Sequence, residues 1–435
     1  MRPTRSPGYR WVVLSMAFMG VFAALGFGRF GYSAVLPAMQ DALGISSAAA
    51  GSLASWNLAG YTIMSAVGGV LAAKLGARKV VTAGIVVTAA GMLITGLADG
   101  LAPASVGRLL TGVGNGLVLV PSVTLMAAWF ESGKLGFASS IVSAGSSLAM
   151  VTVGLAVPRI ITAGGEEGWR RAWYFFAGVT VALAVVNVII QRDRPHDPTP
   201  RRLDIKLDRS APLALRARLK APALDLRSIL RSGYAWHLGL VYMLYGVGFL
   251  IYFTFFQKRL TADLGYSAAE AGYFFLMLGL AGLAGGALWG SVSDRIGRKG
   301  TVVLTLTVCG LAAILFAATS AVFPLVISAI LFGSAGPAVP GLIGVACSER
   351  FGTVLASASL GFVTILVGLG QTFGPYFGGV LGDVFSSLGP TYYFSGGIFI
   401  LGAAGALALR GGAPPLREQL VHGRPRLPVK RAPLR

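Results

Sequence analysis

One passage occurs twice in this sequence, and each copy joins an apolar run to a short basic segment. The first copy begins Leu43-Gly-Ile-Ser-Ser-Ala-Ala-Ala-Gly51 and ends Gly69-Val-Leu-Ala-Ala-Lys-Leu-Gly-Ala-Arg-Lys79. The second begins Leu264-Gly-Tyr-Ser-Ala-Ala-Glu-Ala-Gly272 and ends Gly290-Ser-Val-Ser-Asp-Arg-Ile-Gly-Arg-Lys299. The apolar run between start and end is long enough for the roughly 20 residues that cross a bilayer. Two half-chains that enter a membrane in the same direction form a parallel internal repeat.

Composition also indicates a membrane protein. The chain is 55% hydrophobic and 12% charged, whereas soluble domains carry about 25% charged residues. Its two cysteines, Cys309 and Cys347, lie in apolar segments and offer neither a disulfide framework nor metal-ligand spacing. We find no nucleophile–base pair and no nucleotide-binding loop. We therefore expect no catalytic residues, no metal and no other cofactor, and we do not expect an enzyme.

Apolar runs of membrane length occur in two sets of six and predict an all-α membrane protein with twelve transmembrane helices. Lipid cannot satisfy open backbone groups, so the runs must be helices, and the 61 glycines let such helices approach closely. The predicted domains are an amino-terminal bundle (1–191), a cytoplasmic linker (192–233), a carboxyl-terminal bundle (234–409) and a basic tail (410–435). The runs lie at 11–38, 48–72, 80–100, 103–129, 135–162, 170–191, 234–260, 268–292, 301–320, 322–347, 355–383 and 389–409.

Basic residues predict the orientation. Most of the 36 Lys and Arg residues fall in the two tails, in the linker and in the turns that follow the second, fourth, eighth and tenth apolar runs. The positive-inside rule therefore places both termini in the cytoplasm. The net charge of +20 is explained by this distribution and by contact with anionic membrane lipid. We do not expect nucleic-acid binding.

Three motifs resemble those of the major facilitator superfamily. The stretch Gly290-x-x-x-Asp294-Arg295-x-Gly297-Arg298-Lys299 is similar to the family's G-x-x-x-D-R-x-G-R-K loop. Arg108-x-x-x-Gly112-x-Gly114 and Gly374-Pro375-x-x-Gly378-Gly379 resemble two further family elements. The resemblance covers essentially the whole chain. It implies two six-helix bundles that rock about a central substrate cavity, which gives alternating access.

The first copy of the loop departs from the family pattern. It keeps Gly69, Gly76 and Arg78, but Ala73 stands where the family has an aspartate. The resemblance implies that this acid helps to latch the closed state. We therefore expect a weak latch in the amino-terminal half and an intact one around Asp294. Asp294→Asn should reduce transport more than any single change at 73–79.

The subfamily is less clearly marked. The stretch Gly28-Arg29-Phe30-Gly-Tyr32 through Met39, with Asn57 and Gly60-Tyr61, looks like the bacterial YbfB-type branch. The stretch Trp129-Phe130 through Gly145, followed by Pro158 and Gly168-Trp169-Arg170, is more similar to monocarboxylate and oxalate/formate carriers. The two resemblances leave the substrate open.

Arg29 and Arg108 lie inside apolar runs, where a charge is expensive and therefore a functional candidate. Arg29 could bind an anionic group in the cavity, or it could reach the outer interface or bond helix carbonyls. Arg108 could be structural or take part in proton coupling. No Asp or Glu is expected at mid-membrane depth. A cavity with arginine and no carboxylate favours an anionic substrate and disfavours organic-cation export.

Polar side chains in the runs are further candidates for contact with the substrate, or they tie helices together at about 0.6 kcal/mol each. The predicted substrate-binding residues are Arg29, Asn57, Tyr61, Asn115, Tyr245, Tyr252 and Gln371. The predicted gating residues are Gly69, Gly76, Arg78, Arg108, Gly290, Asp294, Arg295, Gly297, Arg298, Gly374 and Pro375.

These observations predict a secondary transporter of a small organic anion, such as a carboxylate, in a bacterial inner membrane. We expect it to act as a monomer by alternating access. Symport with protons could use the substrate's own protonation or an interfacial acid, and the direction of transport stays open. One alternative in the same fold is an exporter of amphipathic drugs or metabolites. Another is a sensor built on a transporter fold.

Overall fold

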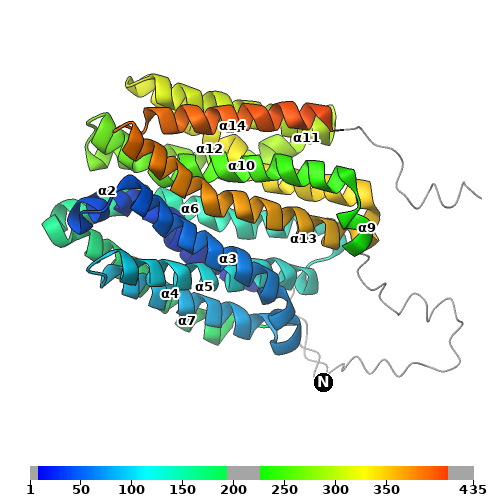
Figure 1. Cartoon of the computed structure of the whole chain (residues 1–435). Coiled ribbons are helices and arrows are strands. Elements are labelled where there is room, and N and C mark those ends of the chain that lie inside the picture. Colours follow the sequence, from blue (N-terminus) through cyan, green and yellow to red (C-terminus); the bar gives the residue numbers. More distant parts are fainter. Residues whose placement is uncertain (1–7, 194–225, 410–435) are drawn as a thin grey trace, which may run out of the picture.

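A computed structural model describes residues 8–193 and 226–409, and these ranges contain helices and no strands (Figure 1). The first half comprises α1 (Tyr9–Val21), η1 (Phe22–Phe30), α2 (Gly31–Leu43), α3 (Ser47–Leu75), α4 (Ala77–Gly96), α5 (Leu101–Trp129), α6 (Ser132–Gly164), η2 (Gly165–Glu167) and α7 (Gly168–Ile190). The second half comprises α9 (Leu226–Leu230), α10 (Gly233–Lys258), η3 (Arg259–Asp263), α11 (Ala268–Ala318), α12 (Val322–Ala335), η4 (Gly336–Ala338), α13 (Val339–Val384) and α14 (Gly389–Ala408). The predicted all-α fold is confirmed.

Within the described residues, ten helical stretches are long and apolar enough to cross a membrane. Two of them, Gly136–Ile190 with 55 residues and Ala268–Ala318 with 51, are far longer than one crossing needs. Each contains two of the predicted apolar runs. The structure is therefore consistent with the twelve predicted crossings.

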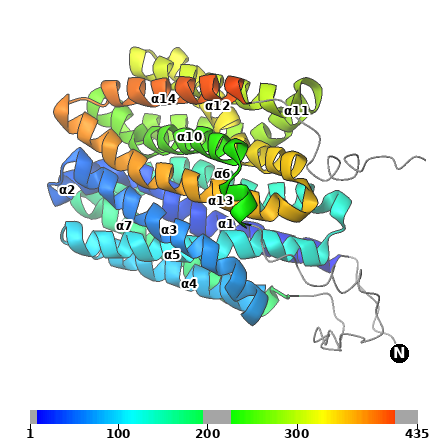
Figure 2. The same ribbon diagram turned by 45° about the vertical axis from the view of Figure 1, so that its right-hand side comes forward.

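The helices of the two sequence halves lie on opposite sides of the molecule (Figures 1 and 2). In Figure 1 the first half, drawn in blue to cyan, lies below the second half, drawn in green to red. The halves meet where α3 runs beside α13 and where α6 runs beside α11. Glycines make these contacts close: a Cβ on Gly154 of α6 would lie 2.5 Å from the carbonyl oxygen of Gly272 in α11.

The two halves are hydrogen-bonded at one end of the molecule, which we name the sealed end. There the Asp383 carboxylate of α13 accepts bonds from the backbone N–H groups of Ser47 (2.7 Å) and Ala48 (2.8 Å). The Lys258 ammonium donates to the Ser47 hydroxyl at 2.7 Å. The first N–H groups of a helix have no intrahelical partner and attract negative charge. Asp383 therefore caps a helix of the opposite half.

Short segments that carry the repeated glycines lie at the other end, which we name the basic end. Gly76 (φ 91°), between α3 and α4, and Gly297 (φ 81°), inside α11, both have positive φ. Side chains other than hydrogen are strained in this conformation. The two copies of the repeated sequence therefore share a positive φ at equivalent glycines.

An acid that the motif did not predict lies beside the first of these segments. The Asp193 carboxylate, which follows α7, accepts a 2.6 Å bond from the Arg78 backbone N–H. It lies so near Gly76 that a Cβ there would be 2.7 Å from Asp193 Oδ2. The amino-terminal half therefore regains, from another part of the chain, the negative charge that is missing at Ala73.

The second segment keeps its own acid. The Arg298 guanidinium donates to Asp294 at 2.9 Å and to Glu349 at 3.0 Å. All three side chains are partly or largely exposed. Most of the predicted linker and the whole basic tail at 410–435 lie outside the described residues.

Candidate functional site

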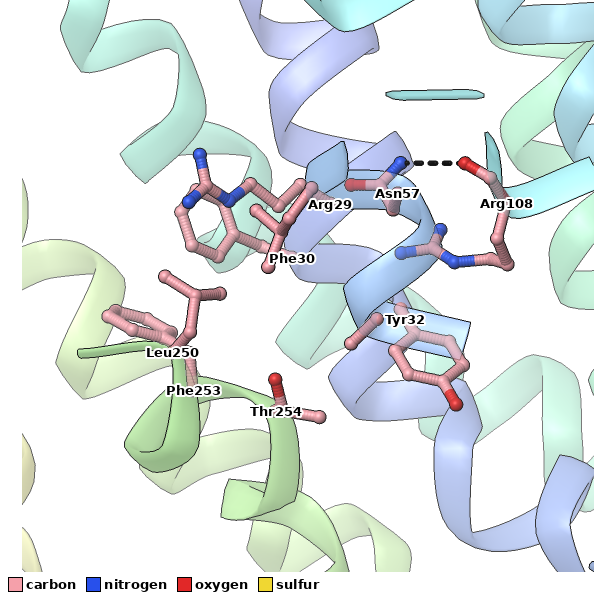
Figure 3. A pocket seen from close by; sticks show the side chains of 10 residues that line it. Arg29, Phe30, Tyr32, Asn57, Arg108, Leu250, Phe253 and Thr254 are labelled. Atoms are coloured by element: carbon pink, nitrogen blue, oxygen red, sulfur yellow. Dashed lines mark hydrogen bonds between the residues drawn. The ribbon is translucent and has the colours of Figure 1, made fainter. Parts of the chain in front are cut away.

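A small pocket lies between the two halves and is lined in part by Arg29 and Arg108 (Figure 3). Its volume is about 10 Å³, which is room for about one water. None of its ten lining residues is Asp or Glu. Figure 3 shows the α10 residues facing the arginine-bearing helices across the pocket. The lining consists of Arg29, Phe30, Tyr32, Ala54, Asn57, Leu58, Arg108, Leu250, Phe253 and Thr254.

Arg29 is placed by an unusual helical segment. It lies in η1, a π-helix of nine residues that interrupts the first membrane helix. Such segments are rare and frequent at functional sites. Small residues let η1 sit close to its neighbours: a Cβ on Gly26 would meet Ala149 Cβ at 2.0 Å, and one on Gly28 would meet Thr111 Cγ2 at 2.8 Å. This tight seating fixes the backbone from which Arg29 enters the pocket.

Arg29 contacts two other predicted site residues. Its Nη2 donates to the Gln371 Oε1 of α13 at 2.9 Å. Its guanidinium carbon lies 5.4 Å from the centre of the Tyr61 ring and 5.7 Å from that of Phe30. The side chain is half-buried, and its Nε has no hydrogen-bond partner. The sequence offered no partner for Arg29; the structure supplies a neutral amide from the opposite half.

Arg108 is more deeply fixed. It is 1% exposed, and its Nη1 donates to the backbone oxygen of Gly28. Its guanidinium carbon lies 4.5 Å from the Tyr32 ring centre and 5.5 Å from that of Trp173. These contacts join α5 to η1, α2 and α7. They favour the structural alternative for Arg108.

Asn57 presents an unpaired acceptor near Arg108. Its Nδ2 donates to the Arg108 backbone oxygen at 3.2 Å (Figure 3). The residue is 1% exposed, and its Oδ1 has no hydrogen-bond partner among the described residues. A buried acceptor that is left unpaired is costly. Asn57 can therefore accept a bond from a molecule that enters the pocket.

Five of the predicted substrate-binding residues lie outside the pocket lining. Tyr61 and Gln371 contact Arg29, and the other three are each bonded within their own half. The Asn115 carboxamide, oriented with its nitrogen toward η1, donates to the backbone oxygens of Ala24 (2.8 Å) and Thr111 (2.9 Å). Tyr245 donates to the Gly336 oxygen at 2.9 Å. Tyr252 bonds Ser328 at 2.8 Å and stacks on the Phe332 ring with centroids 3.6 Å apart. The structure places these side chains among packed helices.

The α10 residues that line the pocket were not assigned from the sequence. Leu250, Phe253 and Thr254 share one helical face because they are three and four positions apart. The Phe253 ring packs against Phe30 of the first half with centroids 4.9 Å apart. Helical periodicity was the one sequence signal that could have grouped these three residues. The sequence analysis selected Tyr245 and Tyr252 of the same helix instead.

Of the predicted gating residues of α13, Pro375 contacts the first half, whereas Gly374 packs against α10 of its own half. A Cβ on Gly51 of α3 would lie 2.1 Å from the Pro375 oxygen, and one on Gly374 would lie 2.8 Å from the Val247 oxygen of α10. By contrast, a Cβ on Gly69 would meet only Val120 of the same half, at 3.6 Å. A Cβ on Gly290 would meet nothing within 4 Å.

An all-helical membrane fold, with two halves side by side and a charged pocket between them, defines a transporter of small solutes. The family model of the Major Facilitator Superfamily matches residues 16–359 and 238–434. The chain belongs to the major facilitator superfamily, as its motifs predicted. It is a multi-pass integral membrane protein.

Similar proteins include one named as a monocarboxylate transporter and one named as a probable sulfoacetate transporter. Monocarboxylate transporter 13 of Rattus norvegicus is 24% identical over 411 residues, which is 92% of this chain and 88% of that protein. The probable sulfoacetate transporter SauU of Cupriavidus necator is 23% identical over 293 residues, which is 67% of this chain and 66% of that protein.

Solved structures show the same fold. The nucleoside transporter NupG superposes with a TM-score of 0.72 at 16% identity, over 93% of this chain and 100% of that one. The inward open xylose transporter XylE from E. coli superposes with a TM-score of 0.71 at 16% identity, over 93% and 98%. At this identity the likeness establishes the architecture and not the substrate.

Proposed function

We propose that the protein is a secondary transporter that moves a small organic anion, a carboxylate, across the membrane by alternating access. The observation that carries this proposal is Arg29. It lines a pocket without an acidic lining residue, and among the described residues its guanidinium bonds a neutral amide and lies near two aromatic rings. A cation in such a place is expensive, and an anion that binds it offsets that cost.

Arginine suits this role chemically. Its planar guanidinium can bind both oxygens of a carboxylate, and bonds between two charged groups are roughly twice as strong as bonds between neutral ones. The relatives named as monocarboxylate and sulfoacetate transporters support a small acid. Because the lining has no carboxylate, coupling to protons would use protonation of the substrate itself or an acid at the interface.

The direction of the molecule in the membrane is part of the same proposal. Lys74, Arg78, Arg295 and Arg298 lie at the basic end, which the positive-inside rule places in the cytoplasm. Both termini would then be cytoplasmic, in a bacterial inner membrane, and the sealed end would face outward. The units that move against one another would be residues 1–191 and 234–409 of a single monomer.

Counterflow in proteoliposomes tests the proposal. The purified full chain is assayed with radiolabelled acetate, oxalate and sulfoacetate, with and without a pH gradient. Arg29→Ala should lower uptake of the transported anion by about tenfold to a hundredfold, because a charged hydrogen bond contributes about 1.5–3 kcal/mol. Arg29→Lys should fall between, since it keeps the charge and loses the planar geometry.

Arg159→Ala is the matched control. Arg159 also lies in a membrane helix, but its guanidinium bonds a carbonyl of its own helix, Leu155, and is exposed. Its loss should change uptake by less than about twofold, as expected for exposed substitutions. Unchanged anion uptake in Arg29→Ala would overturn the proposal. Efflux of an amphipathic dye in place of anion uptake would establish the exporter alternative.

A further inference from the structure

We propose that Gln371 is a positioning residue whose amide oxygen holds Arg29 until a substrate anion replaces it. Anion binding would thereby release a bond between the two halves at the centre of the molecule. This inference rests on the proposed function, in which Arg29 binds the anion. It adds the residue through which occupancy of the pocket acts on the contact between the halves.

The bond joins elements far apart in the chain. Arg29 lies in η1 of the first half and Gln371 in α13 of the second, with Nη2 and Oε1 2.9 Å apart. The other cross-half hydrogen bonds among the described residues involve Ser47, Ala48, Lys258 and Asp383 at the sealed end. The Arg29–Gln371 bond is therefore the cross-half bond that involves a residue of the pocket.

Space in the pocket favours replacement over simple addition. With Gln371 bonded to Arg29, the pocket has a volume of about 10 Å³, close to that of one water. A carboxylate cannot enter beside Arg29 while every side chain keeps its place. The Gln371 amide occupies a guanidinium N–H that a carboxylate oxygen would need for two parallel bonds.

The chemistry of the two acceptors gives the direction of the exchange. The amide oxygen is neutral, whereas a carboxylate oxygen carries charge and binds a guanidinium more strongly. An anion can therefore displace Gln371. A glutamate at this position would instead form a lasting ion pair with Arg29, because an intramolecular carboxylate competes with every external one. The neutral residue holds Arg29 and remains replaceable.

The α13 backbone around Gln371 is held, so the side chain is the part free to move. A Cβ on Gly370 would lie 2.2 Å from the Met243 oxygen of α10, and one on Gly368 would lie 2.5 Å from Thr62 Cγ2 of α3. Such close seating fixes the helix between its neighbours. Gln371 is itself 9% exposed. Its flexible side chain can turn away without a shift of α13.

The experiment compares Gln371→Met and Gln371→Glu in the full-length protein. Uptake of acetate, oxalate and sulfoacetate in proteoliposomes gives KM and maximal rate separately. Thermal denaturation in detergent, with the same anions, reports binding without transport, since a ligand stabilises the state that binds it. Gln257→Met is the matched control, because that buried amide bonds Ala271 within its own half at 3.2 Å.

Displacement predicts opposite effects of the two variants. Gln371→Met keeps the side-chain length and removes the competing acceptor, so KM should fall by about threefold to tenfold, in line with the loss of one hydrogen bond. The anion-induced rise in melting temperature should then occur at lower anion concentration. Gln371→Glu should reduce uptake by at least about tenfold, melt at a higher temperature without anion, and show no further rise with it. Gln257→Met should leave KM unchanged.

The outcomes separate this inference from the proposed function. Loss of uptake in Arg29→Ala, together with a raised KM in Gln371→Met, would show that Gln371 contacts the substrate directly and would overturn displacement. Wild-type KM in Gln371→Glu would also overturn it. Either result leaves the anion site standing. Unchanged uptake in Arg29→Ala would overturn the proposed function itself, whatever the Gln371 variants do.

Discussion

The segments at 69–79 and 290–299 share a sequence pattern, but the acidic residue that each one contacts comes from a different place in the chain. Both contain a glycine with positive φ, Gly76 and Gly297. In the first, Asp193 approaches from the end of α7 and binds the backbone at Arg78. In the second, Asp294 belongs to the segment itself and pairs with Arg298, which also bonds Glu349.

This difference shows that a missing motif residue is not always a missing charge. The Asp193 carboxylate caps α4, so it anchors the first segment within its own half. Asp294 bonds only another side chain of its own segment among the described contacts, and its side chain is 71% exposed. Exposed pairs of this kind contribute little to stability. Asp294 is therefore available for contacts that change during transport, whereas Asp193 holds a fixed structure.

The largest expected difference concerns the two glycines. Gly297→Ala should cost about 1–3 kcal/mol from backbone strain alone, since a Cβ there meets nothing within 4 Å. Gly76→Ala should cost about 1–2 kcal/mol more, because its Cβ also displaces Asp193 from the helix end it caps. Unfolding of the purified variants in SDS measures both. Equal losses would show that Asp193 contributes nothing at Gly76.

The next effect is on transport. Asp294→Asn should slow uptake by about tenfold, equivalent to about 1.4 kcal/mol of activation free energy. Lys74→Gln and Arg78→Gln should each slow it by less than about threefold, because Asp193 binds the backbone and not these side chains. Initial uptake rates at equal protein density measure this. Larger effects in the first segment would reverse the comparison.

The smallest expected effect concerns Asp193 alone. Asp193→Ala removes a capping carboxylate and should destabilise the protein by about 1 kcal/mol. Glu131→Ala is the control, because Glu131 precedes α6 and makes no side-chain cap bond. The difference in their SDS midpoints isolates the cap. If both variants unfold alike, the Asp193 contact is not stabilising.

Much of the fold could be predicted from the sequence, because lipid leaves few choices to an apolar run. The sequence predicted the helical class, the repeat and a break between the apolar runs at 268–292 and 301–320. It could not show that the backbone between these two runs bends at Gly297, whose φ and ψ are not helical. It also could not reveal the π-helix at Phe22–Phe30, because hydrophobic periodicity does not separate a wide turn from an ordinary one within an apolar run.

The candidate site was less predictable, because its partners come together only in three dimensions. Arg29 and Gln371 were separate candidates, and nothing in either local sequence indicates that they bond. Asn57 and Asn115 looked alike as buried amides. Among the described residues the structure leaves Asn57 Oδ1 without a hydrogen-bond partner, whereas the Asn115 nitrogen donates to the Ala24 and Thr111 backbone oxygens. Whether a polar group in a membrane helix has a hydrogen-bond partner depends on residues of other helices, which the local sequence does not indicate.

The glycine contacts between α3 and α13 restrict the kind of motion that can open the sealed end. A Cβ on Gly51 would lie 2.1 Å from the Pro375 oxygen, and one on Gly379 would lie 2.2 Å from the Ser47 oxygen. Because these glycines have no side chain, the backbone of the opposite helix can approach closely. Sliding along the axis would carry these carbonyl oxygens away from the glycines and toward the side chains three and four positions further along the same helix face. The two helices can tilt apart, but they cannot travel lengthwise past each other.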